Sequence, residues 1–325
     1  MYRLALLLMA VWPAAASLPC WVHGAAAVED RVWLLCERGE VLRSMDGGAN
    51  WTLARVAAGP KLRDIAFLDA QRGIIVGDGG ALWFTEDAGQ TWKERKLDTS
   101  DPLTSISTVG ERVWVGGYGG TVYHSPDGGA TWVRQPTTAT RAINDIYFLD
   151  DRHGWAVGWV GLILRTEDGG RTWEEIRTGA TGWSLASVRF RDPRNGWIVG
   201  PFGQILRSRD GGRTWNALES PVRSWLTSIH FDGEGRGWIT AERDILASDD
   251  GETWRALGIE EWMFLETILP VRGRLWGIGP FGLMRQQPSG GWERVDTLKL
   301  NTLARPQHPA SGELAAALAR DGAGR

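Results

Sequence analysis

The stretch "RTEDGGRTW", Arg165–Trp173, returns with small changes at an almost constant interval along the chain. Close copies are "RSMDGGANW" ending at Trp51, "FTEDAGQTW" at Trp92, "HSPDGGATW" at Trp132 and "RSRDGGRTW" at Trp215. A shorter copy, "ASDDGETW", ends at Trp254, and a stub, "SGGW", ends at Trp292. The closing tryptophans are 41, 40, 41, 42, 39 and 38 residues apart. This regularity predicts a repeat architecture rather than seven independent sites.

Each repeat reads as four short strands. The fullest example is "INDIYFLDDRHGWAVGWVGLILRTEDGGRTWEEI", Ile143–Ile176. It contains an apolar alternation, a turn, a second apolar run, a glycine turn, a third run, the repeated box and a last strand. Four short strands bounded by Gly or Asp turns are typical of a propeller blade, and helical periodicity is absent. The sequence therefore predicts an all-β fold, a seven-bladed β-propeller, as a single domain over residues 17–325.

Composition agrees with this fold class and excludes one kind of partner. The 325 residues include 43 glycines and 20 tryptophans, which fits many tight turns between strands that bury large rings. The formal net charge of -3 comes from 36 basic and 39 acidic residues spread evenly along the chain. Proteins that bind nucleic acid show a concentrated basic surface, so we expect no nucleic-acid partner.

The N-terminus, "MYRLALLLMAVWPAAASLPC", predicts a signal peptide over residues 1–16. Arg3 precedes an apolar run, and small residues follow at Ala14–Ala16. The run is too short for a permanent membrane anchor. A lipoprotein would be acylated at Cys20, but Pro19 stands where a small residue is wanted. No later stretch reaches eighteen uninterrupted apolar residues, so we expect an exported, periplasmic protein without an integral membrane segment after signal cleavage.

The repeated box carries its own turn chemistry. Its Asp can accept hydrogen bonds from the turn backbone, while a glycine such as Gly212 takes the positive φ that a side chain opposes. Its tryptophan leads the outermost strand and is expected to lie in the seam against the blade. Because the carboxylates recur once per blade, they lie far apart, which favours a stabilising role over catalysis or calcium binding. These carboxylates are Asp46, Asp87, Asp127, Asp168 and Asp210. We expect no metal and no cofactor.

The string "SxDGGxTW" is similar to the Asp box of BNR repeats. Its coupling to "FxDxxxGWxVGxxGxILRT" resembles the photosystem II stability/assembly factor family of seven-bladed propellers, over nearly the whole mature chain. Members in phototrophs are lumenal or periplasmic chaperones that bind a membrane protein during assembly, and relatives occur in bacteria without photosynthesis. The resemblance implies an exported, non-catalytic scaffold, assembly or stability factor for a membrane-associated protein complex, with photosystem II as the client in a phototrophic host.

Enzymes of the sialidase type are the main alternative, since they also carry Asp boxes on propellers. A sialidase needs a tyrosine nucleophile, an acid and three converging arginines. The mature chain has three tyrosines, Tyr118, Tyr123 and Tyr147, and lacks the arginine-isoleucine-proline motif of that family. Its five histidines show no ligand spacing. We predict a protein that is not an enzyme; a carbohydrate-binding or glycoside-hydrolysing BNR-repeat protein is the alternative.

A candidate docking surface lies on the face opposite the boxes, where the connections between second and third strands emerge. Alignment on the boxes puts aromatic residues into glycine-flanked turns there: Tyr118, Trp159, Phe202 and Phe281. The connections that lead into each blade add Trp183, Arg223, Trp225 and Trp262. Aromatic residues in such turns have little core to fill, so we predict that they bind a protein partner. Packing against neighbouring loops is the structural alternative.

The two cysteines, Cys20 and Cys36, are candidates for a disulfide. Aligned on the boxes, Cys36 ends a second strand and Cys20 opens the first strand of the same blade. If the hairpin turns near Val28 to Asp30, the two residues lie opposite each other within one step of register, at a separation a disulfide can span. Export would supply the oxidising compartment. A slip of one residue would leave two buried thiols instead.

The chain continues beyond the last tryptophan through "LNTLARP" and "GELAAALARDG". These stretches resemble the first two strands of a further repeat, without a box. We expect residues 296–325 to take part in closing the ring by completing or reinforcing the first blade.

Overall fold

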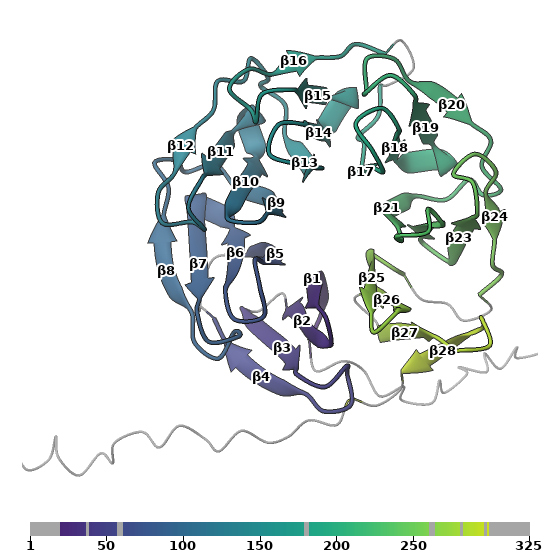
Figure 1. Ribbon diagram of the computed structural model, residues 1–325, viewed down its shortest axis with the longest axis horizontal. Helices are drawn as coiled ribbons and strands as arrows, with labels where there is room; N and C mark the ends of the chain where they lie inside the picture. The colour runs from purple at the N-terminus through teal and green to yellow at the C-terminus, as the bar shows by residue number, and fades with distance from the viewer. Residues whose placement is uncertain are drawn as a thin grey trace, which may run out of the picture.

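The computed structural model describes residues 20–36, 39–56, 61–178, 182–259, 264–279, 282–295 and 298. These residues form seven four-stranded sheets, and each sheet consists of four consecutive strands. The sheets stand as blades around a central opening (Figure 1). The predicted all-β, seven-bladed propeller is confirmed. Residues 1–16, the predicted signal peptide, lie outside the described part of the chain. Within that part, no helix is long and apolar enough to cross a membrane.

In each blade the four strands lie side by side in chain order, the first at the central opening and the fourth at the rim (Figure 1). The inner strands are β1 (Val22–Val28), β5 (Leu62–Phe67), β9 (Leu103–Val109), β13 (Ile143–Phe148), β17 (Ser187–Phe190), β21 (Leu226–Phe231) and β25 (Thr267–Val271). The second strands are β2 (Arg31–Cys36), β6 (Gly73–Gly77), β10 (Arg112–Gly117), β14 (Gly154–Gly158), β18 (Gly196–Val199), β22 (Gly237–Ala241) and β26 (Arg274–Gly279).

The remaining strands complete the blades. The third strands are β3 (Glu40–Ser44), β7 (Ala81–Thr85), β11 (Val122–Ser125), β15 (Ile163–Thr166), β19 (Ile205–Ser208), β23 (Asp244–Ser248) and β27 (Gly282–Gln286). The outer strands are β4 (Thr52–Arg55), β8 (Lys93–Lys96), β12 (Val133–Arg134), β16 (Glu174–Glu175), β20 (Asn216–Leu218), β24 (Arg255–Ala256) and β28 (Trp292–Val295). Short 3₁₀ turns join second to third strands at η1 (Asp78–Gly80), η2 (Tyr118–Gly120), η3 (Trp159–Gly161) and η4 (Pro201–Gly203).

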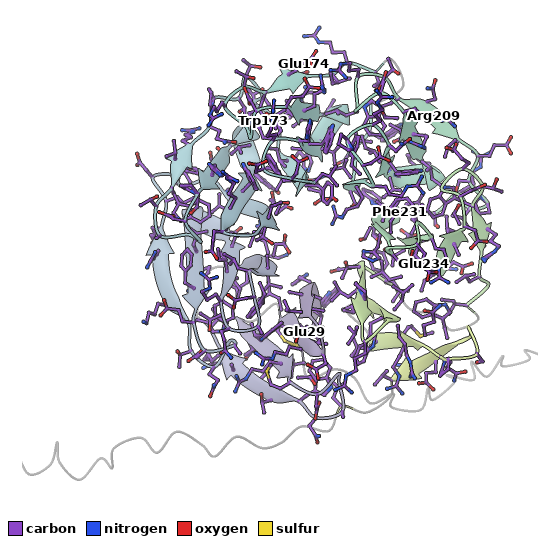
Figure 2. All side chains as sticks on the ribbon, in the orientation of Figure 1. Glu29, Trp173, Glu174, Arg209, Phe231 and Glu234 are labelled. Carbon is purple, nitrogen blue, oxygen red and sulfur yellow. A yellow bond between two sulfur atoms is a disulfide. The ribbon has the colours of Figure 1, made fainter. Side chains whose placement is uncertain are left out.

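Burial explains the sequence of each strand type. The second strands β6 and β14 are buried along their whole length, because each lies between two neighbouring blades. Strands covered on both faces read as continuous apolar runs rather than as alternations. The outer strand β8 is exposed at all four of its residues, which are Lys, Glu, Arg and Lys. Side chains fill the spaces between the blades, whereas the centre of the ring stays open (Figure 2).

Aromatic ladders join neighbouring blades. At one seam, Trp155 of β14 stacks on Phe190 of β17 with ring centroids 3.4 Å apart, and Phe190 meets the box residue Trp215 edge-on at 5.8 Å. The Trp155 indole Nε1 donates to the Gly211 carbonyl oxygen at 3.0 Å. The same arrangement recurs at three other seams, as Trp33–Phe67–Trp92, Trp114–Phe148–Trp173 and Trp197–Phe231–Trp254. The second-strand tryptophan therefore forms the centre of each of these seams.

The box tryptophans occupy the outer part of the seams, as the sequence predicted, but their burial varies. Trp51 is fully buried, whereas Trp92, Trp132, Trp173 and Trp215 are only partly covered. The second-strand tryptophans fill the interior of the seams, an arrangement that the repeated box alone did not predict.

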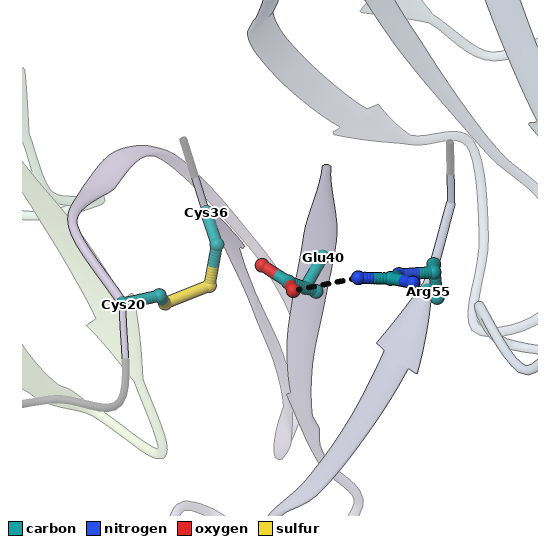
Figure 3. The surroundings of a disulfide bond; sticks show 4 residues. All are labelled: Cys20, Cys36, Glu40 and Arg55. Carbon is teal, nitrogen blue, oxygen red and sulfur yellow. Dashed lines mark ion pairs between the residues drawn. A yellow bond between two sulfur atoms is a disulfide. The ribbon is translucent and has the colours of Figure 1, made fainter. Parts of the chain in front are cut away.

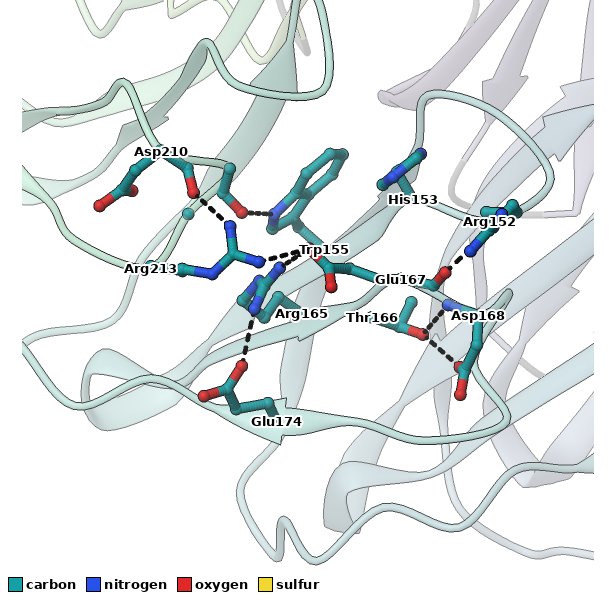
Figure 4. A network of polar contacts seen from close by, with 12 residues as sticks. Arg152, His153, Trp155, Arg165, Thr166, Glu167, Asp168, Glu174, Asp210 and Arg213 are labelled. Atoms are coloured by element: carbon teal, nitrogen blue, oxygen red, sulfur yellow. Dashed lines mark hydrogen bonds and ion pairs between the residues drawn. The ribbon is translucent and has the colours of Figure 1, made fainter.

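An ion-pair network reinforces the seam between the fourth and fifth blades at the rim (Figure 4). Arg213 donates to the Asp210 carbonyl oxygen at 2.9 Å and, across the seam, to Glu167 at 2.8 Å. Glu167 also pairs with Arg165, which in turn donates to Glu174 at 2.8 Å. Two neighbouring blades thus share one carboxylate.

Hydrogen bonds confirm that the box folds its own turn (Figure 4). In the fourth blade, Asp168 Oδ1 accepts from the Thr166 hydroxyl at 2.8 Å and from the Thr172 N–H at 2.9 Å, and Oδ2 accepts from the Thr172 hydroxyl at 2.7 Å. The Thr166 oxygen accepts from the Gly170 N–H at 2.9 Å, and Gly170 has φ 87°. Both oxygens of the Asp168 carboxylate thus accept hydrogen bonds from within the box turn. Among the described residues, no group of three or more His, Cys, Asp or Glu side chains could hold a metal ion.

The ring closes between the first and last blades through side chains. Val22, Leu34 and Trp51 share one buried cluster with Trp276 and Ile278. Arg272 also donates to Asp30 at 2.7 Å. The first blade takes all four of its strands from residues 22–55. The expectation for residues 296–325 falls outside the described residues except at Leu298, which packs against this cluster.

A disulfide between Cys20 and Cys36 lies at the start of the first blade, with the Cα atoms 5.6 Å apart (Figure 3). The hairpin turns between Val28 and Arg31, and Cys36 pairs with Val22 in the ladder. Cys20 therefore lies two residues before the residue opposite Cys36. The register shift between Val22 and Gly24 recurs at the same place in four other blades.

Candidate partner-binding face

The turns between second and third strands hold side chains in an unusual backbone conformation. Val160 and Phe202, the middle residues of η3 and η4, have φ 51° and φ 58°. Glycine occupies the same position in η1 and η2, at Gly79 and Gly119. A left-handed conformation is unfavourable for a side chain, above all for a β-branched one. Strain of this kind gathers at functional sites, so two apolar side chains held there point to a binding role.

Large apolar side chains are exposed on this face. Trp159 is 48% exposed, Trp183 58%, Phe202 59% and Trp225 44%. Nine large hydrophobic residues among those described are exposed by more than a third, and six of them lie on this face: Trp21, Trp159, Val160, Trp183, Phe202 and Trp225. Exposed apolar side chains that gather on one face of a folded protein are typical of interaction sites.

The exposed rings form pairs that keep one side open to solvent. Trp183 meets Phe202 edge-on, with centroids 4.9 Å apart, and Tyr118 lies 5.6 Å from Trp159. Tyr118 is half-buried because it also lies under the Arg63 guanidinium, 5.4 Å from its ring centroid. Four rings of this face thus have a ring neighbour.

Backbone hydrogen bonds hold the loops of neighbouring blades together. The Gly161 N–H donates to the Trp183 carbonyl oxygen at 2.7 Å, and the Gly203 N–H donates to the Ser224 carbonyl oxygen at 2.8 Å. Arg141 donates to the Val160 carbonyl oxygen at 2.9 Å and to Glu175 at 2.5 Å. The face is therefore a preorganised platform, which lowers the entropy lost on binding.

The structure brings most of the predicted residues together. Tyr118, Trp159, Phe202, Trp183 and Trp225 lie on one face over the third to sixth blades, and Arg223 is exposed beside Trp225. Phe281 and Trp262 lie outside the described residues. Within the turns, Phe202 sits one position later than Tyr118 and Trp159.

Sequence reasoning missed Trp21, which is 47% exposed. Trp21 directly precedes β1, just as Trp225 directly precedes β21, so both lie where an inner strand starts on this face. Comparing the residues that directly precede the inner strands would have identified Trp21 from the sequence.

The central channel opens in the middle of this face and encloses about 310 Å³. Its polar wall joins neighbouring inner strands. Asp145 of β13 accepts from Arg189 at 2.7 Å and from the Val188 N–H of β17 at 2.9 Å. Asp64 of β5 accepts from the Ile106 N–H of β9 at 2.9 Å. Burial raises the pKa of the Asp64 carboxyl to about 7, although the hydrogen bond from Ile106 acts in the opposite direction.

A second concave region lies on the opposite face, beside the box of the fourth blade. It has a volume of about 660 Å³. Four arginines contribute to its walls, namely Arg112, Arg134, Arg152 and Arg171. Two carboxylates offset them, since Asp151 pairs with Arg112 at 2.9 Å and Asp168 lies in the box. We call this region the arginine groove.

Seven self-contained blades, five with a full-length box, one with a box shorter by one residue and one with a stub, define the molecule as an Asp-box β-propeller. A family model described as photosynthesis system II assembly factor YCF48 matches residues 48–140 and 179–263, more than half of the chain. The chain belongs to this family, which confirms the resemblance found in the sequence. No curated protein matches the sequence.

Solved structures share the fold. One titled "YCF48 bound to D1 peptide" has 24% identity and a TM-score of 0.60, over 74% of this chain and 82% of that chain. YCF48 from Cyanidioschyzon merolae has 23% identity and a TM-score of 0.54, over 66% and 78%. A catalytically inactive virginiamycin B lyase from Staphylococcus aureus, with quinupristin, has 14% identity and a TM-score of 0.70, over 81% and 94%. Propellers of this shape thus include both assembly factors and enzymes, so the fold alone does not decide between them.

Proposed function

We propose that this protein is an exported, non-catalytic assembly or stability factor that binds a segment of a membrane-protein complex on its aromatic face. Membership of the YCF48 assembly factor family supports the role, and a structural neighbour with a bound D1 peptide supports a polypeptide of photosystem II as the partner. The observation that carries the assignment of the face is the set of apolar side chains exposed there, two of them in left-handed turns.

The chemistry of the face agrees with a polypeptide partner. Trp159, Trp183 and Phe202 offer rigid apolar rings next to backbone groups, and rings of this kind dominate the binding energy of protein interfaces. The box carboxylates, in contrast, are used within their own turns. An exported location, periplasmic or equivalent to the thylakoid lumen, fits the disulfide and remains part of the proposal.

The test is a binding assay with a fluorescently labelled D1 peptide, read by anisotropy. We expect the wild-type chain to bind, and the double variant Trp159→Ala, Trp183→Ala to lose about tenfold or more in affinity, since each lost anchor costs about 1 to 2 kcal/mol. The matched control is Arg134→Ala, Arg171→Ala in the arginine groove, which should bind as the wild type does.

If only the Arg134→Ala, Arg171→Ala variant lost affinity for the peptide, the docking site would lie on the box face instead. Absence of binding by the folded wild-type chain would overturn the proposed partner. Binding or cleavage of a polysaccharide by the same preparation would favour the alternative, a carbohydrate-active Asp-box protein.

A further inference from the structure

The start of β1 differs from the start of every other inner strand described. The inner strands of the second to seventh blades each follow the outer strand of the blade before them, as β17 follows β16. In the described part of the chain, β1 follows no outer strand. Among the described residues, the restraint on the start of β1 comes from the contacts of residues 20–23.

The disulfide supplies this restraint. It ties Cys20 to Cys36, the last residue of β2, which is fully buried in the cluster between the first and last blades. The β1–β2 ladder ends at the pair Val22–Cys36, after a register shift between Val22 and Gly24 that recurs at the same end of the ladder in four other blades. Without the covalent link, the residues before Gly24 would depend on that single pair and on side-chain packing.

The residues next to the disulfide face the seam and the aromatic face. Val22 is buried against Val271 and Ile278 of the last blade. His23 lies 3.9 Å from Glu266, also of the last blade. Trp21 is 47% exposed and stacks on His23, with ring centroids 6.4 Å apart. Residues 20–23 thus include the disulfide, contact the last blade where the propeller closes, and carry the exposed indole of Trp21 on the docking face.

We propose that the Cys20–Cys36 disulfide is a redox latch, which holds Trp21 in the docking face and keeps the seam between the first and last blades closed. The inference rests on the proposed function for its effect on binding, but not for its effect on the seam. Oxidised protein binds the partner segment with Trp21 as an additional anchor, and reduced protein binds it less tightly.

The exposure of the two sulfurs fixes the chemistry of release. Cys20 is partly exposed, whereas Cys36 is fully buried. A thiolate of a dithiol reductant therefore attacks Cys20 Sγ, the S–S bond breaks, and Cys36 leaves as a thiolate that takes up a proton. The second thiol of the reductant then attacks the mixed disulfide. The products are two cysteine thiols and an oxidised reductant, so that two electrons pass to the protein.

The experiment compares four forms of the full mature chain: oxidised wild type, wild type reduced in the folded state and alkylated, Cys20→Ser, and Trp21→Ala with the disulfide intact. Hydrogen exchange of β1 and β25 reports the seam, and β14 and β18 serve as internal controls. Anisotropy with the labelled D1 peptide reports docking.

We expect reduction and Cys20→Ser to speed exchange in β1 and β25 by about tenfold or more and to leave β14 and β18 unchanged. Both forms, and Trp21→Ala, should bind the peptide about three- to tenfold more weakly than the oxidised wild type. Trp21→Ala should leave exchange in β25 unchanged.

Equal exchange in oxidised and reduced protein would overturn the latch. If reduction speeds exchange but leaves the affinity for the peptide unaltered, Trp21 is not part of the docking face. If the oxidised wild type binds no peptide, the proposed partner fails, while the exchange measurements still decide whether the disulfide holds the seam.

Discussion

Two residues of this propeller have a backbone conformation that is unfavourable for any side chain. Val160 and Phe202 adopt the left-handed conformation in turns where two other repeats use Gly79 and Gly119. Nothing in the turn itself requires a side chain there, because the glycine repeats fold the same turn. The side chains at these two positions are therefore what the proposed docking role would explain.

Replacing Phe202 by glycine separates these two roles. The variant Phe202→Gly relieves a left-handed side chain, worth about 1 kcal/mol, and loses little packing because the ring is mostly exposed. We expect a melting temperature equal to or above that of the wild type, together with weaker binding of the partner peptide. A variant that melts well below the wild type would show that the ring is structural.

The box aspartates predict a definite response to acid. Hydrogen bonds from the Thr131 hydroxyl and N–H lower the pKa of Asp127 to about 2. Because the pKa of this carboxyl is about 3.9 in the unfolded chain, its contribution to stability is complete above that value and is lost as the pH falls toward 2.

Urea unfolding of the wild type and of Asp127→Asn between pH 5 and pH 2 tests this. The wild type should be more stable at pH 5, and the difference should shrink as the pH falls. The control is Glu86→Gln, an exposed carboxylate beside the second box. A difference that stays constant with pH would contradict the assignment.

At the scale of strands and blades, the seams depend on a residue outside the repeated box. Trp155 is buried, stacks on Phe190 of the next blade and donates to that blade's box carbonyl. The box residue Trp173 is only partly buried and meets Phe148 by an edge. The second strand of one blade is therefore held by the inner strand and the box of the next.

These positions predict unequal effects of truncation. Trp155→Ala should lower the free energy of unfolding by about 3 to 5 kcal/mol, as for other large-to-small core changes. Trp173→Ala should cost less, about 1 to 3 kcal/mol. Trp183→Ala, on the exposed face, is the control and should change little. Denaturant unfolding measures these losses. An equal loss of stability in Trp155→Ala and Trp173→Ala would contradict the conclusion that second-strand tryptophans stabilise the seams more than box tryptophans.

Much of the architecture could be predicted from the sequence because its determinants are local. The box folds its own turn through hydrogen bonds within five residues, so its spacing gave the number of blades. The stacking of Trp155 on Phe190 could not be predicted, since it joins different blades and depends on how the sheets twist past each other. Trp21 was missed because the start of the first strand has no preceding box from which to count.

At the scale of the whole molecule, each described blade takes its four strands from consecutive residues, and the described contacts between the first and last blades are packing and the ion pair of Arg272 with Asp30. The first blade additionally contains a covalent link. We expect the denatured, unreduced mature protein to titrate no free thiol and to have the mass of a monomer. Two free thiols per chain would contradict the disulfide, and a dimer mass would show that the cysteines pair between chains.

The completeness of each blade also bears on the order in which the protein folds. Among the described strands, every ladder joins neighbours in sequence, so a blade can form as soon as its own repeat is available, and local contacts of this kind form fast. The ion pair that closes the ring joins residues 242 positions apart. We therefore expect the blades to appear one after another along the chain, and the approach of the first blade to the last to be the slow final step.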